Sequence, residues 1–496
     1  MKKNNRTTKK KSSQQVEKKQ SSSRSMSLSI VREHVAGIDV GSKFSIACVG
    51  EDTKNDFQKF GQMTEDLQAM ATWFKLRGVQ SVVMESTAHY WQPIFDVLQS
   101  AGFEVFVVNG RATKNPDGTK NDYKDSLHLY RLHSLGMTKN SYLPDDQTDY
   151  LRTLSRYRQD LVRRSMRSVH HLQKTLRRMN ICLEDVLSDV VGASGTAILE
   201  AIIAGERDAE KLYLLTNYNR LKSSKGEIIR ALTGNWREDS LFYLTAEYNM
   251  YLHYAEKIAE LDVKIDDYLK NQSELKKKAD LIANDGLIVE APALSKDRQG
   301  NSRPYIRARK QGHKHEIKFD IQQYAYDLLG TDLFAIPGVG AESVLLFLSE
   351  VGTDVEKFSS AGHFKSWLGL APNHRISGGK ILSRHTKRSS NRLTVALRQG
   401  ASTVKSKKGH SQLKHLYHRV ASRSSKSTAV VATAGKIATT IWYCVKNRCA
   451  YKELSEEEYN LQHRQKHLVQ LRKRAANLAL SEEEQSFVFG KASQAA

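Results

Sequence analysis

The stretch VAGIDVGSKFSIACVG, residues 35–50, decides the fold class. Its two apolar halves, VAGIDVG and FSIACVG, are joined by a Gly-Ser-Lys turn, which predicts two short strands that open a sheet as a hairpin. Asp39 lies inside the first strand, flanked by Gly37 and Gly41. A carboxylate in mid-strand is costly to bury unless it is paired or bound to a metal. The stretch therefore predicts an opening hairpin that carries a functional acid.

The chain continues with alternating helical and apolar segments. TEDLQAMATWFKLRG at 64–78 has apolar residues at helical spacing and ends in glycine, which predicts a helix. The apolar runs QSVVMES at 80–86 and FEVFVVNG at 103–110 predict strands, and WQPIFDVLQSAG at 91–102 between them predicts a second helix. Strand, strand, helix, strand, helix, strand indicates an α/β domain with a mixed sheet.

Three further acids stand where a strand ends or a helix begins. Glu85 ends the apolar run VVM, and Asp122 and Asp125 are three apart in a segment that becomes helical, so both face one side. Asp122 taken singly is equally typical of a helix cap. Together with Asp39, these acids predict a carboxylate cluster, which natural proteins neutralise with one or two Mg²⁺ or Mn²⁺ ions. Metals held this way suit phosphoryl transfer on a nucleic-acid backbone.

Long charged helices follow this domain. One is expected from residue 145 or 146 to about 180 and another over 239–270, both as a coiled-coil arm with a basic flank. The predicted apolar seams are Val162, Met166, Val169, Leu176 and Met179 in the first, and Leu244, Tyr248, Tyr251, Tyr254, Ile258, Leu261, Ile265 and Leu269 in the second. Residues 296–318 hold eight basic and two acidic residues and predict a basic linker. A compact helical region over 325–446 and a last helix over 455–480 complete the chain.

The charge balance favours a polyanionic partner. Lys and Arg total 77 against 54 Asp and Glu, so the 496-residue chain has a formal charge of +23, and the first 30 residues are too polar to fold. The mean hydropathy of -0.54 predicts no bilayer span of about 20 residues. The four cysteines are expected to be reduced, and Cys444 and Cys449 have no companion Cys or His pair of the zinc type. We expect no membrane anchor and a cytoplasmic location.

Two motifs in the second half point to phosphate binding. The turn PGVG at 337–340 precedes an amphipathic helix, which is typical of a helix-hairpin-helix or of a simple helix-helix turn. Ser377 precedes Gly378, Gly379 and Lys380 in a predicted loop. Its hydroxyl could attack a phosphodiester, although an SGG turn of this kind more often only binds phosphate. Its basic neighbours are Arg375, Arg384, Lys387 and Arg388.

GIDVGSK also suits the phosphate-gripping hairpin of sugar-kinase and actin-like ATPases. The sequence shows no second glycine-rich phosphate hairpin and no P-loop pattern, which disfavours nucleotide hydrolysis.

The order of these motifs resembles the DEDD-type insertion-sequence transposases, the group that includes the Piv-type DNA invertases and the bridge-RNA-guided recombinases. The resemblance covers about residues 35–480 and includes VVNGRATKNPDGTKNDYKDSLHLYRLHSLGM, ALTGNWREDSLFYL, LFAIPGVGAESVLLFLSEVGTD, WLGLAPNHRISGGK and VVATAGKIATTIWYCVKN. The middle helices resemble those of the subgroup with a longer linker.

The resemblance implies a domain plan and a fold. Residues 33–145 would form a RuvC-like, RNase-H-type domain after a disordered basic tail at 1–32. Coiled-coil helices and the basic linker would occupy 146–325. A mainly helical transposase domain with the helix-hairpin-helix and the serine loop would occupy 326–450, and a helix and tail 451–496.

The resemblance also implies roles. Asp39, Glu85, Asp122 and Asp125 would bind Mg²⁺ or Mn²⁺, and Ser377 would be a nucleophile that forms a transient phosphoserine link to DNA. Gly338, Gly340, Arg375, Gly378, Gly379, Lys380, Arg384, Lys387 and Arg388 are the expected nucleic-acid contacts. Expected partners are the DNA ends and target, a guide RNA, and further copies of the chain in a dimer or tetramer, at the nucleoid.

The chain departs from the family pattern at two positions. Asn121 stands where relatives often have threonine, and Ile376 with Ser377 where they commonly have two serines, which leaves one candidate hydroxyl. Two other functions remain open: a metal-dependent RuvC-like nuclease or junction resolvase in which Ser377 only binds phosphate, and an inactive nucleic-acid-binding derivative of a transposase.

Overall fold

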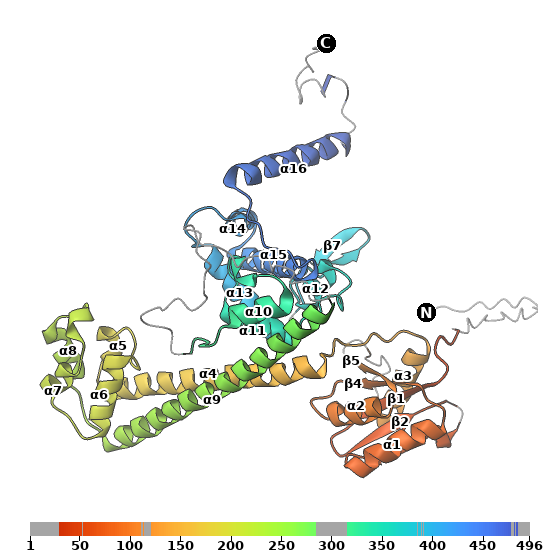
Figure 1. Ribbon diagram of the computed structural model, residues 1–496, viewed down its shortest axis with the longest axis horizontal. Helices are drawn as coiled ribbons and strands as arrows, with labels where there is room; N and C mark the ends of the chain where they lie inside the picture. The colour runs from red at the N-terminus through yellow and green to blue at the C-terminus, as the bar shows by residue number, and fades with distance from the viewer. Residues whose placement is uncertain are drawn as a thin grey trace, which may run out of the picture. The chain divides into compact units, whose positions relative to one another are not determined.

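The computed structural model describes residues 29–51, 53–110, 113, 121–283, 315–383, 385–387, 389, 391–477, 481 and 483–484 (Figure 1). The chain forms two compact units that meet in sequence between Leu143 and Pro144. The basic tail up to residue 28, most of the basic stretch 296–318, and the predicted contacts Arg384 and Arg388 lie outside the described residues.

The first unit is built on a mixed five-stranded sheet. Its strands are β1 (Val35–Val40), β2 (Phe44–Cys48), β3 (Phe57–Gly61), β4 (Ser81–Glu85) and β5 (Glu104–Val108), in the order β3-β2-β1-β4-β5. β1, β2 and β3 pair antiparallel, whereas β4 pairs parallel with both β1 and β5. Strand β3 was not among the predicted strands, because this edge strand has exposed polar residues at 58 and 59 between its two phenylalanines.

Helices cover both faces of the sheet, and the alternation of side chains along the strands explains how. Val82 and Met84 pack with α1 (Thr64–Leu76) and α2 (Trp91–Ser100) in one apolar cluster. Val83, from the opposite face of β4, packs with Leu129 of α3 (Asp122–Ser134) in another. The unit therefore has the RNase-H-like α/β architecture that the resemblance implied.

The second unit contains a long antiparallel helix pair. α4 (Asp146–Arg178) and α9 (Glu238–Ala283) contact each other along their length, as Figure 1 shows. Arg178 binds Asp239 at 3.0 Å and Arg158 binds Asp262 at 2.5 Å, which shows that the two helices run in opposite directions. Four short helices at one end, which share an apolar core with the pair, are α5 (Leu183–Val186), α6 (Ala193–Ile203), α7 (Ala209–Leu214) and α8 (Lys225–Leu232).

The predicted seam of α4 was partly wrong. Met166 is 44% exposed, and the buried stripe is offset from it and contains Ser155, Arg158, Ser165 and Ser168. Small hydroxyl side chains let the facing helix approach closely, and Arg158 is buried because Asp262 neutralises it. The predicted seam of α9 is buried except for Tyr254, which is half-buried.

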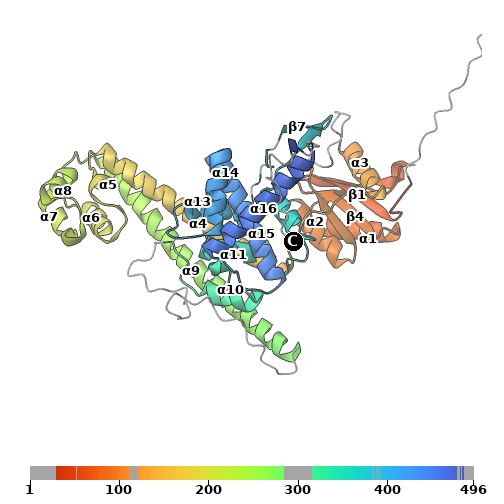
Figure 2. The same ribbon diagram turned by 90° about the horizontal axis from the view of Figure 1, so that it is seen from above.

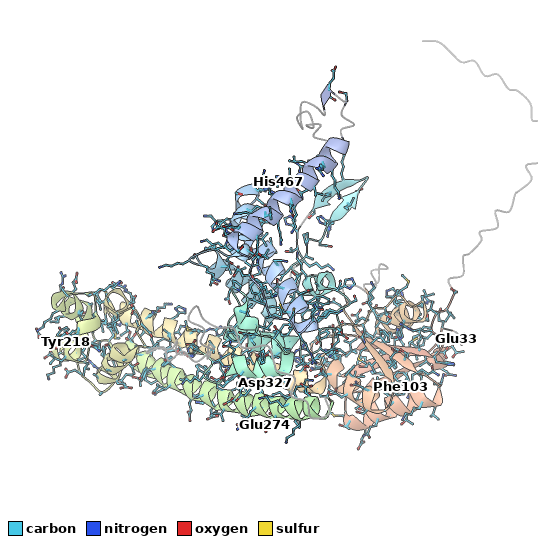
Figure 3. The ribbon with its side chains drawn as sticks, turned by 45° about the horizontal axis from the view of Figure 1, so that its top comes forward. Glu33, Phe103, Tyr218, Glu274, Asp327 and His467 are labelled. Carbon is cyan, nitrogen blue, oxygen red and sulfur yellow. The ribbon has the colours of Figure 1, made fainter. Side chains whose placement is uncertain are left out.

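The C-terminal part of the second unit is helical, as predicted. It contains α10 (Ile321–Leu329), α11 (Ala341–Glu350), α12 (Ala361–Trp367), α13 (Arg392–Val404), α14 (Gln412–Arg423), α15 (Lys426–Lys446) and α16 (Glu456–Asn477), with a small hairpin, β6 (Arg375–Ser377) and β7 (Lys380–Ser383). Glu350, only 2% exposed, joins this part to α4 through a two-pronged contact with Arg156, at 2.8 Å for each oxygen. Most described side chains of α16 are exposed, including His467 (Figure 3).

α15 is long and apolar enough to cross a membrane by length and composition, which the sequence analysis did not foresee. However, 56% of its apolar window is buried. Its buried side chains contact α12, α13 and α14, and Trp442 donates a hydrogen bond to the carbonyl of Val355 at 3.2 Å. It therefore packs as a core helix of the second unit (Figure 2).

Candidate active site

The sheet places Asp39 and Glu85 side by side. Both lie at the carboxyl ends of adjacent parallel strands, β1 and β4, and the register pairs Ile38 with Met84, so the next residues are neighbours. Asp122 and Asp125 lie in the first turn of α3. Asn121 caps this helix, since its side chain accepts the N–H of Tyr123 at 3.0 Å. Asparagine at this position therefore fixes the helix start from which both acids project.

Gly37 explains how α3 reaches the sheet so closely. A Cβ atom at this position would lie 2.4 Å from the backbone nitrogen of Tyr130 and 2.5 Å from the carbonyl oxygen of Ser126. The backbone of α3 thus lies directly on β1, two residues from Asp39. The missing side chain at Gly37 brings the acids of the helix to those of the sheet.

We expect Gly37→Ala to damage the site without touching an acid. The new methyl group meets backbone rather than a flexible side chain, so α3 must move away from β1, at a cost of about 2 kcal/mol in the free energy of unfolding. Chemical denaturation of the variant measures this cost. Gly226→Ala is the matched control, because its Cβ would meet nothing within 4 Å. Equal stability of the two variants would contradict this role for Gly37.

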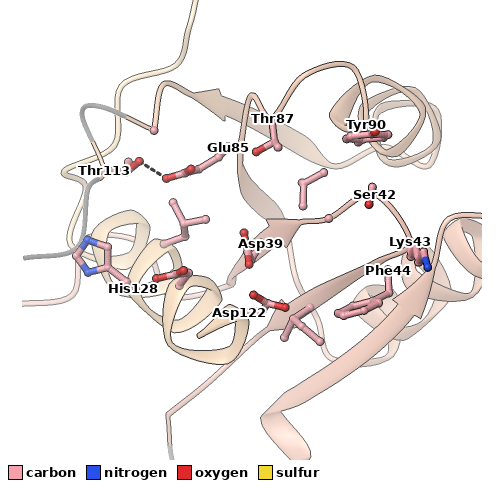
Figure 4. Close-up of a pocket in the computed structure, with 16 residues that line it drawn as sticks. Asp39, Ser42, Lys43, Phe44, Glu85, Thr87, Tyr90, Thr113, Asp122 and His128 are labelled. Carbon is pink, nitrogen blue, oxygen red and sulfur yellow. Dashed lines mark hydrogen bonds between the residues drawn. The ribbon is translucent and has the colours of Figure 1, made fainter. Parts of the chain in front are cut away.

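All four acids line one cavity of about 770 Å³ (Figure 4). Glu85 is held in place by Thr113, whose hydroxyl donates to its Oε1 at 2.5 Å. Gly110 makes room for the same side chain, since a Cβ there would lie 2.7 Å from the Oε2 of Glu85. Other residues that line the cavity are Ser42, Lys43, Phe44, Thr87, Tyr90 and His128.

The cavity suits a hard divalent cation. Its acidic donors are all carboxylate oxygens, the ligands that Mg²⁺ and Mn²⁺ prefer. The oxygens are spread around the wall: among the described residues, no three of the four acids bring oxygens within 4.8 Å of one another. Mg²⁺ usually keeps several waters and takes only one or two carboxylates directly, so a spread set of acids fits it.

Sequence reasoning missed Thr113, Tyr90, Lys43 and His128. Thr113 is 28 residues from Glu85 in sequence and lies beyond the end of β5, so no local spacing links the two. His128 shares α3 with the two aspartates and lines the same cavity as Thr113 (Figure 4). These positions become visible only when the helix and the strand ends are placed together.

A buried histidine ties α3 to the sheet at its other end. His133 is fully buried, its Nε2 lies 2.8 Å from the hydroxyl of Ser81, and its Nδ1 lies 2.7 Å from that of Thr138. Arg32 lies 3.1 Å from Nδ1 and can only donate, so Nδ1 accepts and Nε2 carries the proton. Burial, and then the charge of Arg32, lower the pKa of His133 from 6.5 to about 4.

Because of the lowered pKa of His133, we expect the first unit to lose folding stability in acid. Between pH 6.5 and about 4, His133 is protonated in the unfolded chain and neutral in the folded one. The free energy of unfolding therefore falls as pH falls through this window, by up to about 3 kcal/mol. Hydrogen exchange of α3 at pH 7 and pH 5 measures the effect. His133→Gln lacks the titrating group and should lose this part of the pH dependence. An identical pH response in both proteins would contradict the assignment.

Ser377 lies in the second unit, at the end of β6. The predicted loop is a β-hairpin: Ser377 pairs with Lys380, and Gly378 and Gly379 form the turn with φ of 54° and 74°. Two consecutive positive φ values explain the two glycines. Ser377, Arg375, Lys380 and Lys387 are all exposed. The hairpin therefore presents the exposed hydroxyl of Ser377 beside basic side chains.

The PGVG turn is packed against a neighbouring helix at Gly338 and open at Gly340. Gly338 has a φ of 87°, and a Cβ on Gly400 of α13 would lie 2.0 Å from its carbonyl oxygen. Gly338 thus allows the turn to touch α13. Gly340 is the N-cap of α11 and has no neighbour at its Cβ position within 4 Å. Phosphate binding at this turn stays a prediction.

Comparison with known proteins agrees with this arrangement. A family model named for DEDD transposases of the IS110 group, and described as a transposase, matches residues 36–181. A second, described as "Transposase IS116/IS110/IS902 family", matches residues 331–427. No curated protein matches the chain. The first match spans the whole carboxylate cavity and the second spans the serine hairpin. The chain belongs to the IS110 family of DEDD transposases, enzymes that cleave and transfer DNA.

Proposed function

We propose that this transposase excises and inserts its own mobile element by phosphoryl transfer, with Asp39, Glu85, Asp122 and Asp125 as metal ligands and Ser377 as nucleophile. The observation that carries the proposal is the meeting of all four acids on one cavity, in the part of the chain that matches the DEDD family model. In the alternative, a nuclease or junction resolvase, Ser377 would not react. An inactive derivative would cut no DNA at all.

In this proposal, different side chains bind the metal, attack the phosphorus and neutralise the phosphate charge. A bound Mg²⁺ or Mn²⁺ ion supplies stabilisation of negative charge on the oxygens of the reacting phosphate. Thr113 orients Glu85 through its hydrogen bond. The Oγ of Ser377 forms a bond to phosphorus and loses its proton, while the bond from phosphorus to the leaving sugar oxygen breaks and that oxygen gains a proton. Arg375, Lys380 and Lys387 neutralise the phosphate charge beside the serine.

The covalent link preserves the energy of the broken bond. A hydroxyl of a second DNA end can attack the phosphoserine, which restores the phosphodiester and frees Ser377. The reaction therefore needs no water at the phosphorus and no external energy source. A plasmid that carries the element with its native flanking DNA tests this in cells: the proposal expects a resealed excision junction, and linear ends without a junction would favour the nuclease.

We further propose that the arm formed by α4 and α9 binds nucleic-acid backbone, either the DNA ends or a guide RNA encoded by the element. Much of the predicted basic flank of α4 is already neutralised: Arg158 by Asp262, Arg156 by Glu350, and Arg177 by Asp185. Arg164, Arg167 and Lys174 are exposed and remain candidates for phosphate contacts. The net charge of +23 suits such a polyanionic partner. We propose that the protein acts at the nucleoid, in the cytoplasm.

The paired variant Arg164→Ala/Arg167→Ala should weaken binding without loss of the fold. Each lost phosphate contact lowers the slope of log affinity against log salt by about 0.9, so the slope should fall by about 2. Filter binding of element DNA and of its transcript over a salt series measures both slopes. The control is Lys75→Ala on α1, an exposed lysine of the first unit. An unchanged slope for both nucleic acids would exclude this face of the arm.

We propose that the protein acts as a dimer or tetramer. Phe242 of α9 is 79% exposed, and Met250, about two turns further along the same side of the helix, is 43% exposed. Neighbouring exposed apolar side chains of this kind are typical of a surface that another protein covers. Mixing Asp39→Ala with Ser377→Ala protein tests whether the two functions can come from different subunits. Recovered activity would show that they do, and an inactive mixture would assign both to one chain.

A further inference from the structure

Two imidazoles and a carboxylate meet where α14 and α16 begin. His410 directly precedes the N-cap of α14, His415 lies in the first turns of that helix, and Glu456 is the first residue of α16. One ligand atom from each of the three side chains lies within 4.8 Å of the other two. This group is outside the carboxylate cavity and the serine hairpin, so the proposed transposase chemistry does not use it.

The two imidazoles already have the separation that a shared metal needs. The Nε2 of His415 lies 3.2 Å from the Nδ1 of His410. Two nitrogens bound to a tetrahedral Zn²⁺ at its usual bond length lie about 3.4 Å apart. The distance between these two atoms therefore needs almost no change for both to bind one ion.

Protein hydrogen bonds leave one ring nitrogen of His410 without a partner in the described part of the chain. This nitrogen, Nε2, is buried. Among the described residues, the one hydrogen-bond contact of its Nδ1 is with the other imidazole. The ring as a whole is half-buried. A metal bond at Nδ1 would replace the contact between the two imidazoles and fix the orientation of the ring, while Nε2 would stay in its buried position.

The surroundings hold the three side chains in place. The ring of Tyr459, on the first turn of α16, stacks on His415 at 5.3 Å and meets His410 at 6.0 Å. Ser455 and Glu458 cap this helix reciprocally, at 2.9 and 3.2 Å. Glu453 accepts the backbone N–H of Gln412 at 2.9 Å, which ties the segment before α16 to the start of α14. These contacts hold the N-terminus of α16, and with it Glu456, beside the start of α14.

We propose that His410, His415 and Glu456 bind one Zn²⁺ ion that fastens α16 to α14. Two imidazoles and one carboxylate form a zinc ligand set with a fourth position left for water. Nitrogen donors select zinc over magnesium and calcium, which take oxygen ligands. The ion would cross-link the first residues of two helices, at Gln412 and Glu456, which are 44 residues apart in sequence.

Cobalt substitution of the full-length protein, without a histidine tag, tests the site. Co²⁺ in a tetrahedral site with nitrogen ligands absorbs visible light strongly, whereas Co²⁺ in the oxygen-rich tetrad, if octahedral, absorbs weakly. We expect metal-free wild type to develop the strong bands with one equivalent of Co²⁺, and Zn²⁺ to abolish them. His415→Asn and Glu456→Gln should lose the bands, and Zn²⁺ affinity measured against a chromophoric chelator should fall about a hundredfold.

The control is His418→Asn. His418 lies on the same helix and is exposed, and its ring Nε2 lies 3.3 Å from the carbonyl oxygen of Lys405. It should bind Co²⁺ as wild type does. Glu456 is exposed, so Glu456→Gln should retain the fold, which circular dichroism verifies. Strong bands that are absent in wild type, or retained in either ligand variant, would overturn the proposal.

Discussion

Asp39→Asn is expected to lower the rate of Mg²⁺-dependent strand cleavage about a thousandfold. The substitution keeps the shape of the side chain and removes the negative charge at the point where β1 and β4 bring two acids together. Asparagine is a weak ligand for a hard cation, so the metal that stabilises charge on the reacting phosphate would be lost or displaced. Cleavage of DNA that carries the element ends, measured at saturating protein over a Mg²⁺ series, gives the effect.

Glu104→Gln is the matched control for this prediction. Glu104 is an exposed acid at the start of β5, at the opposite end of the sheet strands from the tetrad, and does not line the cavity. Its variant should cleave at the wild-type rate. If Asp39→Asn also cleaves at the wild-type rate, the cavity is not the active site.

Ser377→Ala should reduce strand transfer by on the order of 10⁴-fold. Removal of the hydroxyl removes the nucleophile, and the neighbouring position holds Ile376, which offers no substitute. DNA binding should persist, because Arg375 and Lys380 remain in the hairpin. Recombination of element plasmids in cells, with binding measured separately, distinguishes the two effects.

Ser383→Ala controls for the hairpin itself. Ser383 ends β7 and pairs with Arg375, so its removal leaves Ser377 and the Gly-Gly turn intact. It should recombine normally. If Ser377→Ala still cuts DNA, the protein is a metal-dependent nuclease in which the serine only binds phosphate.

The first domain was largely predictable from the sequence because its signals are local. Apolar runs that end in Glu85 or begin with VAGIDV fix both the strands and the position of the acids on them. Parallel pairing then places strand ends at one edge, so Asp39 and Glu85 could be expected to meet. The closeness of α3 could not be predicted, because it depends on what lies above Gly37 in space.

The second unit was less predictable because its packing is partly polar. Apolar periodicity suggested a seam through Met166, whereas the buried stripe of α4 contains serines and Arg158. That arginine is stable in the stripe because Asp262, 104 residues away, and the carbonyl of His315 accept its hydrogen bonds. The cluster of His410, His415 and Glu456 was invisible for the same reason: it joins segments that no short motif connects.

The most direct measurement maps the covalent link between protein and DNA. Wild-type protein is trapped on element DNA under denaturing conditions, digested with nuclease and trypsin, and analysed by mass spectrometry. Cleavage after Arg375 and Lys380 would release the peptide ISGGK, and the account predicts that it carries a nucleotide phosphate on Ser377. The adduct should be absent from Ser377→Ala and Asp39→Asn. DNA that is cut with no adduct, or an adduct on another residue, would contradict the account.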